Sequence, residues 1–119
     1  MNARGEHHWL GYIIRMAGRA IYHSGDCVPY EGLPERLAAE RIDVALLPVN
    51  GRGKGVPGNF TFEEAVALCR AAQIPVLVAH HFGMFAFNTV DETELKRKMA
   101  GLAPGLRVIM PCVNERYDL

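Results

Sequence analysis

Apolar positions along the chain recur with the spacing of strands in some segments and with the spacing of helices in others. The order of these segments predicts a layered α/β domain. Two short runs on either side of Ala17-Gly18 alternate as strands do, which is typical of an antiparallel hairpin. Two later runs are continuously apolar, as in strands buried on both faces of a sheet. The predicted strands are residues 9–16, 19–23, 43–49, 75–79 and 107–110.

Helical patterns separate the later strands. Residues 31–41 carry Leu33 and Leu37 four apart, with Pro34 in the first turn. Thr61 with Glu64 forms a capping box at the start of a second helix. A third helix is predicted from its acidic start at Asp91 and Glu94, its basic end at Lys96-Arg97-Lys98 and the following Gly101.

The resulting order, β-β-α-β-α-β-α-β, predicts the fold class. Strands alternating with helices imply right-handed crossovers and a mixed, mainly parallel sheet with helices packed on it. The expected architecture is α/β, with an antiparallel hairpin followed by βαβαβ units. The length of 119 residues fits one domain over residues 1–119.

Composition narrows the classes of partner. Thirteen basic and 13 acidic residues give zero net charge, so we expect no nucleic-acid partner and no membrane surface. No apolar run approaches the roughly 20 residues of a membrane span, and the start of the chain has no secretory h-region. Three cysteines without a CxxC pair favour a reducing, cytoplasmic setting.

Polar residues follow several predicted strands at their carboxyl ends. Asp26 follows the second strand, Asn50 the third, and His80 and His81 the fourth. Ligands of open parallel sheets bind outside these strand ends, so we expect the four side chains along one edge.

The hairpin brings further histidines to this edge. A turn at Ala17-Gly18 pairs residues whose numbers sum to about 35, which places His7 and His8 opposite Asp26 and Cys27. Imidazole and carboxylate are ligands of zinc, manganese and iron. The sequence therefore predicts a divalent metal site, with Asp26 and a histidine as the core of it.

Structural alternatives exist for each of these residues. Asp26 after a glycine fits a turn with a capping side chain, and one histidine of an adjacent pair commonly serves as a hydrogen-bonding partner, because neighbours point opposite ways. His7 and His8 fit a solvated terminus. His23 fits a packed or capping role.

The glycine-rich segment 50–59 lacks the spacing of a phosphate-binding P-loop and fits a surface loop. Arg52 and Lys54 within it are candidates, together with Asn50, for binding a small anionic substrate. Cys27 is a poor nucleophile candidate because the carboxylate beside it raises the pKa of the thiol.

Three segments together resemble the metallo-β-lactamase superfamily, in particular its branch of ascorbate-6-phosphate lactonase-like, metal-dependent hydrolases. These segments are residues 21–26 (IYHSGD), residues 43–51 (DVALLPVNG) and residues 75–85 (PVLVAHHFGMF) with Asn88 and Asp91 behind them. The resemblance runs from about His8 to Pro111.

The resemblance implies a binuclear metal site in an αββα sandwich. Asp26 would be the bridging carboxylate, His80 the terminal histidine ligand and His81 a neighbour of the site. The metals, Zn or Mn, would activate a water that attacks a lactone, ester or phosphoester. The family motif H-x-H-x-D-H does not occur in the chain, which corresponds to roughly the C-terminal half of the family's fold.

Three functional hypotheses follow. The chain is a truncated hydrolase, or a half-fold completed by a second copy or by an N-terminal-half partner chain, or a self-sufficient unit holding one metal through His7 or His8, Asp26 and His80. A catalytically inactive fragment or a small-anion-binding module is the alternative to enzymatic function. Catalytic zinc generally needs three protein ligands, so association is expected to complete the site.

Overall fold

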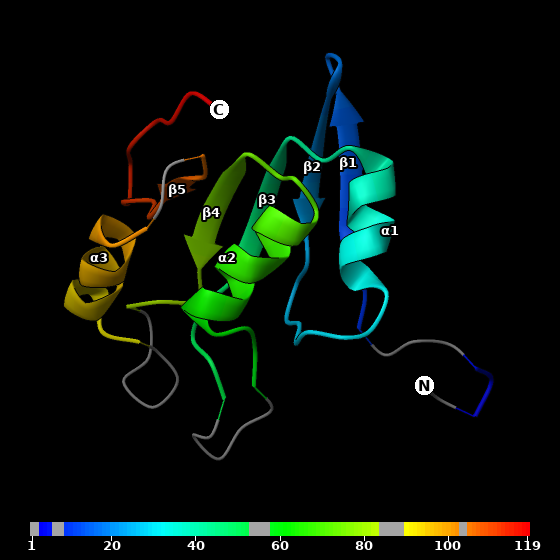
Figure 1. Cartoon of the computed structure of the whole chain (residues 1–119), viewed down its shortest axis with the longest axis horizontal. Coiled ribbons are helices and arrows are strands. Elements are labelled where there is room, and N and C mark those ends of the chain that lie inside the picture. The colour runs from blue at the N-terminus through cyan, green and yellow to red at the C-terminus, as the bar shows by residue number, and fades with distance from the viewer. Residues whose placement is uncertain (1–2, 6–8, 53–57, 84–89, 103–104) are drawn as a thin grey trace.

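Five strands form one sheet in the sequential order β1-β2-β3-β4-β5 (Figure 1). The structure is a computed structural model, and it describes residues 3–5, 9–52, 58–83, 90–102 and 105–119. β1 and β2 are antiparallel, and every other neighbouring pair is parallel. The predicted fold class and order of elements are confirmed. The elements are β1 (Tyr12–Met16), β2 (Arg19–His23), α1 (Leu33–Glu40), β3 (Val44–Pro48), α2 (Phe62–Ala71), β4 (Val76–His80), α3 (Glu92–Ala100) and β5 (Arg107–Ile109).

The hairpin has the predicted register, because Tyr12 pairs with His23 and Met16 pairs with Arg19. Ala17 and Gly18 both have positive φ, 51° and 76°, as the two central residues of a type I′ turn require. The first strand begins at Tyr12 rather than at residue 9, because the ladder to β2 ends there.

The helix boundaries follow their caps. Thr61 accepts a hydrogen bond from the backbone N–H of Glu64 at 3.2 Å, and α2 begins at the next residue. Asp91 accepts one from Thr93 N at 2.7 Å at the start of α3. These side chains satisfy backbone donors that a helix leaves open in its first turn, so the sequence signals locate both starts correctly.

All three helices contribute to one core on one face of the sheet. Right-handed crossovers between sequential parallel strands place successive helices on the same side, and Figure 1 shows α1 and α2 in front of the strands. Leu37 of α1, Phe62 of α2 and Leu95 of α3 lie in the same buried cluster as Tyr22 and Leu77 of the sheet.

The opposite face of the sheet, here called the open face, carries alternate strand residues. Its buried centre is Val44, Val76 and Ile109, with Ile21, Leu46, Val78 and Tyr117 packed around them. The C-terminal segment lies on this face, because Arg107 donates to the Asp118 carbonyl at 2.8 Å and Arg19 donates to the Leu119 carbonyl. Towards the β1 edge the same face carries the exposed side chains of Tyr12, Ile14 and Met16.

The three cysteines are free thiols, with Cys69 buried and Cys112 exposed. None of the helices in the described part of the chain has the length and apolar character needed to cross a membrane.

Candidate metal centre

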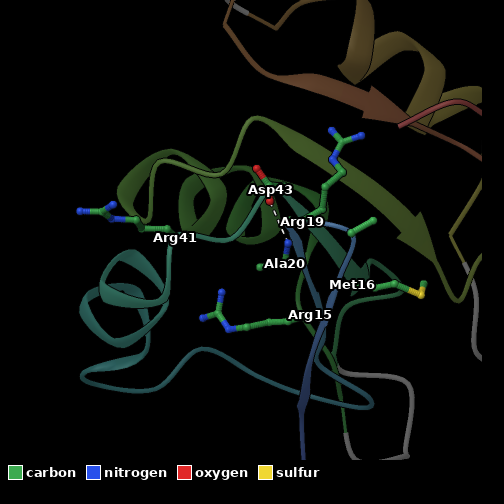
Figure 2. Close-up of a pocket in the computed structure, with 8 residues that line it drawn as sticks. Arg15, Met16, Arg19, Ala20, Arg41 and Asp43 are labelled. Atoms are coloured by element: carbon green, nitrogen blue, oxygen red, sulfur yellow. Dashed lines mark hydrogen bonds between the residues drawn. The ribbon is translucent and has the colours of Figure 1, made fainter.

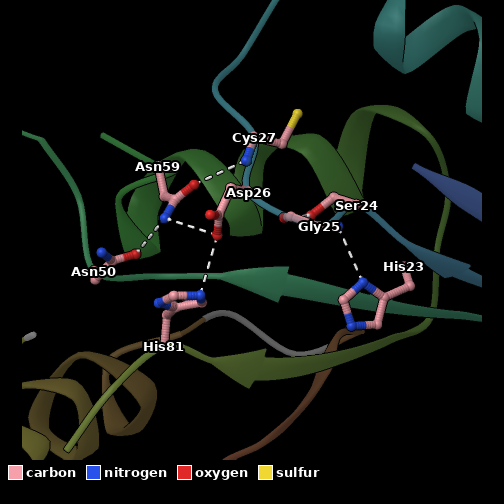
Figure 3. Close-up of polar contacts among 8 residues, drawn as sticks. All are labelled: His23, Ser24, Gly25, Asp26, Cys27, Asn50, Asn59 and His81. Atoms are coloured by element: carbon pink, nitrogen blue, oxygen red, sulfur yellow. Dashed lines mark hydrogen bonds and ion pairs between the residues drawn. The ribbon is translucent and has the colours of Figure 1, made fainter. Parts of the chain in front are cut away.

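Asp26 lies at the carboxyl edge of the sheet in a small polar cluster, which we call the carboxyl-edge cluster and define as Asp26, Asn50, Asn59 and His81 (Figure 3). The Asn59 side-chain nitrogen donates to Asn50 Oδ1 at 2.9 Å and reaches Asp26 Oδ1 at 3.5 Å. The Asn59 oxygen accepts from the backbone N–H of Cys27 at 2.8 Å. One buried amide therefore connects the segment that carries Asp26 and Cys27 to Asn50, which follows β3.

His81 completes the cluster, with its Nε2 3.0 Å from Asp26 Oδ1 (Figure 3). It comes directly after β4 and has φ of 61°, a left-handed conformation that non-glycine residues adopt rarely. Because this backbone leaves the extended conformation, the ring does not follow the alternation of the strand, and it faces Asp26. Unusual backbone conformations of this kind concentrate at functional sites.

His80 is the last residue of β4, and its ring lies 5.1 Å from that of His23 and 5.4 Å from that of His81, between centroids. His80 Nε2 is buried and has no hydrogen-bond partner among the described residues. Burial, followed by the charges of His23 and His81, lowers the pKa of His80 to about 4. The ring is therefore neutral at pH 7, as a metal-binding imidazole must be.

This pKa predicts a dependence of stability on pH. Between pH 6.5 and about 4, the unfolded chain binds a proton at His80 that the folded chain does not bind. The free energy of unfolding should fall as pH falls through this window, by about 1–2 kcal/mol once solvent screening of the ring is allowed for. Thermal melts of wild type and His80→Phe test this, because the variant should lose that part of the slope. Equal slopes in both proteins would contradict it.

His23 makes a structural contact with the turn that follows β2. Its Nδ1 accepts a hydrogen bond from the Gly25 backbone N–H at 3.0 Å (Figure 3). An accepting Nδ1 places the proton of the neutral ring on Nε2. His23 thereby orders the turn that presents Asp26.

The proposed substrate-binding residues have different surroundings. Asn50 is buried and accepts from Asn59, as described above. Arg52 pairs with Glu64, donates to the Asn59 carbonyl at 2.9 Å, and by its hydrogen bond lowers the pKa of Glu64. Lys54, His7 and His8 lie outside the described residues.

Burial is the main cause that raises the pKa of the Cys27 thiol, which agrees with its dismissal as a nucleophile. Sequence reasoning missed Asn59, the residue that connects the cluster. Its position directly before Phe60 gives no sequence signal for this role, because its partners Asp26 and Asn50 lie 33 and 9 positions away.

A hollow of about 510 Å³ lies at the turn end of the β1-β2 hairpin, and its lining includes Arg15, Arg19 and Arg41. Figure 2 shows the guanidinium group of Arg19 pointing away from those of Arg15 and Arg41, while the Asp43 carboxylate accepts from Ala20 N at 2.8 Å. Arg15 is paired with Glu40. Without converging charges, this hollow is a poor anion site.

Comparison with known proteins decides the family. A family model described as a beta-lactamase superfamily domain matches residues 1–82, more than half of the chain. The chain belongs to the metallo-β-lactamase superfamily. The chain is also similar to proteins described as metal-dependent hydrolases, which agrees with this membership.

Two curated relatives of this superfamily domain are archaeal. A metal-dependent hydrolase of Thermoplasma acidophilum is 32% identical over 111 residues, which are 92% of this chain and 46% of the relative. A metal-dependent hydrolase of Methanosphaerula palustris is 38% identical over 90 residues, which are 72% of this chain and 37% of the relative. The chain thus spans less than half the length of these relatives.

A solved structure has the same fold. It is described as a novel metallo hydrolase from Ignicoccus hospitalis, and it matches with a TM-score of 0.64 and 27% identity over 85% of this chain and 41% of that one. The shared part therefore includes nearly all of the elements described above.

Membership of the superfamily implies a bound metal ion. The described residues include suitable ligand types, but too few such side chains lie together to hold an ion. Carboxylate and imidazole are suitable donors, and the buried Nε2 of His80 has no other partner in the described part of the chain. However, no group of three His, Cys, Asp or Glu side chains among the described residues is placed to hold an ion. The ligand set is incomplete within these residues.

Proposed function

We propose that this chain is a metal-dependent hydrolase-like half-domain that supplies part of a metal site. The proposal is carried by the contact between Asp26 Oδ1 and His81 Nε2, at the sheet edge where the parallel strands end. Two further observations support it. Asn59 also contacts Oδ1, and Asp26 Oδ2 has no partner among the described residues. The relatives of the chain are described as metal-dependent hydrolases.

In this proposal Asp26 and His81 hold the metal, and His7, His8 or the partner completes the ligand set. His80, directly before His81 in the sequence, is the alternative histidine ligand. A bound Zn or Mn ion lowers the pKa of a water molecule and so supplies the attacking hydroxide. The protein's own part is to hold neutral imidazoles and an oriented carboxylate at one edge. The Asn59 amide does the orienting, as outer partners of metal ligands commonly do.

The proposed substrates are small lactones, esters or phosphoesters, in line with the resemblance to the ascorbate-6-phosphate lactonase-like branch. Asn50, Arg52 and Lys54 are the proposed substrate-binding residues. Arg52 is held by Glu64 and by the Asn59 carbonyl, and its remaining N–H donors are those that would contact an anionic substrate. The three free thiols fit a cytoplasmic setting.

We also propose that the single domain works by association, with a second copy or with a separate N-terminal-half chain. Sheets with parallel strands are normally covered on both faces, and here helices cover only one. Ile14 and Met16 on the open face are more than half exposed, which costs free energy in water. A partner that covers this face would remove that cost and bring further ligands near the site.

The second candidate is a catalytically inactive fragment or a small-anion-binding module. The absence of a three-ligand group from the described residues favours it. Ligand binding that survives Asp26→Ala would support this candidate over metal chemistry.

A metal-binding test separates the two. Zn²⁺ or Mn²⁺ at ten times its dissociation constant should stabilise the wild-type chain by about 1.4 kcal/mol, raising the melting temperature by several degrees. Asp26→Asn and His81→Asn should lose this gain, and asparagine tolerates the left-handed backbone at position 81. Glu92→Gln on α3 is the matched control and should keep it. A gain that persists in both site variants would contradict the proposal.

Light scattering tests the association. At micromolar concentration the chain should have a mass above the 13.2 kDa of one copy. A clean monomer would reject the second copy as partner.

A further inference from the structure

Two adjoining hollows form one trough beside the carboxyl-edge cluster. They have volumes of about 230 and 560 Å³ and share Trp9, Leu10, Gly11, Tyr22 and Tyr30 as lining residues. We call the joined space the aromatic trough and define it by these five residues. Its size is in the range of sites for small organic ligands.

The walls of the trough are aromatic and unusually exposed. The Trp9 side chain is 74% exposed and that of Tyr30 is 55% exposed, although both are large rings that gain free energy from burial. Gly11 lies against the buried Tyr22, because a Cβ at this position would lie 3.0 Å from the Tyr22 ring. Gly11 therefore packs directly on the Tyr22 ring, where a side chain would not fit without a shift.

The two ends of the trough differ in charge. Asp26, with Ser24 and Cys27, lines one end, so the trough opens directly onto the candidate metal centre. Arg36 of α1 lines the other end together with Leu33 and Leu37. The guanidinium of Arg36 makes no hydrogen bond or ion pair to any residue in the described ranges. Its helical neighbour Glu40 is instead paired with Arg15.

We propose that the aromatic trough binds a small molecule with an apolar, aromatic body and one anionic group. The anionic group pairs with Arg36, and the body packs between Trp9 and Tyr30. The opposite end of the ligand then faces Asp26, which lines that end of the trough. The inference rests on the proposed function for its substrate role, because it names the class of substrate that the metal centre would act on.

Charge decides the orientation of the ligand. An anion beside Asp26 would meet a like charge, whereas one beside Arg36 meets an unpaired cation. Planar guanidinium groups also match carboxylate and phosphate geometry. A hydrolysable bond therefore falls at the end of the ligand away from its anionic group.

Trp9 is the only tryptophan of the chain, so its fluorescence reports directly on the trough. The probes are 2-naphthoate, which has the aromatic body and the anion, and 2-naphthalenemethanol, which has the body alone. We expect saturable changes with both, and tighter binding of naphthoate. Arg36→Gln should weaken naphthoate by about 5-fold and leave the alcohol within about 2-fold. Tyr30→Ala should weaken both probes by about 5-fold.

Arg97→Gln, an equal charge change on an exposed turn of α3, is the matched control and should alter neither probe. Circular dichroism melts of each variant confirm that it folds. Equal naphthoate affinity of Arg36→Gln and wild type, or no saturation with either probe, would overturn the inference. The binding needs no metal. Metal stabilisation without probe binding would thus reject the trough alone, and probe binding without metal stabilisation would reject the proposed function alone.

Discussion

Replacement of Phe60 by alanine should lower the free energy of unfolding by about 3–5 kcal/mol, a large share of the stability of a domain of this size. Phe60 is fully buried within the main core. Its carbonyl accepts from Gly51 N at 2.9 Å, and Asn59 N donates back to the Gly51 carbonyl at 2.9 Å. The variant should therefore lose packing and also loosen the segment that carries Asn59.

Urea denaturation followed by circular dichroism measures this loss. Phe60→Leu keeps most of the buried volume and should cost less than half as much. Val113→Ala shortens an apolar side chain at a position that is 90% exposed and should change stability by less than about 0.5 kcal/mol. A Phe60→Ala protein as stable as the Val113→Ala control would contradict this account of the core.

Replacement of Asn59 by alanine should cost about 1–3 kcal/mol, because buried and half-buried polar groups lose a hydrogen bond. Cys27 N loses its acceptor and the buried Asn50 Oδ1 loses a donor, whereas the exposed Asp26 Oδ1 keeps its contact with His81. Asn114→Gly removes an exposed amide at a position whose φ of 63° glycine tolerates, so it should have little effect and is the matched control. Denaturation midpoints of the two variants and of wild type give the comparison.

A structural role alone would lower stability without altering the site. The proposed orienting role predicts more: under conditions where Asn59→Ala remains folded, its metal affinity should be about 10–100-fold weaker than that of wild type. Calorimetric titration with Zn²⁺ measures it. An unchanged affinity would show that the amide supports the fold and not the ligands.

The sequence predicts this fold well because its signals are local. The two-residue turn at Ala17-Gly18 determines the whole hairpin register, and Tyr12 pairs with His23 as expected. Thr61 and Asp91 mark helix starts through hydrogen bonds that span two or three residues. The continuous apolar runs at residues 43–49 and 75–79 predict strands that are buried on both faces, as the strands of a mainly parallel sheet are.

The candidate site was predicted in its location but not in its contacts. The rule of strand ends brings Asp26, Asn50 and His81 to one edge, and Figure 3 shows them there. Which of two adjacent histidines faces Asp26 depends on the φ of 61° at His81, and no propensity announces that value. The family resemblance assigned His80 as the terminal ligand, whereas the direct contact with Asp26 is made by His81.

Long-range contacts explain what the sequence could not supply. Asn59 joins Asp26 from 33 positions away, and Arg52 pairs with Glu64 across a turn of the chain. The exposure of Trp9 and Tyr30 similarly depends on how α1 packs beside β2, which is a property of the assembled domain. Pattern analysis finds the candidates, and only packing assigns their partners.

The central claim is that one divalent ion binds at Asp26 and His81, and paramagnetic broadening by Mn²⁺ tests it most directly. In a ¹⁵N-labelled sample, substoichiometric Mn²⁺ should broaden the amide signals of Gly25, Asp26 and His81 first. The signal of Gly18, at the other end of the hairpin, should stay sharp, and Asp26→Asn should abolish the selective broadening. Uniform broadening, or selective broadening centred on the acidic start of α3 with the Asp26 signal unaffected, would contradict the claim.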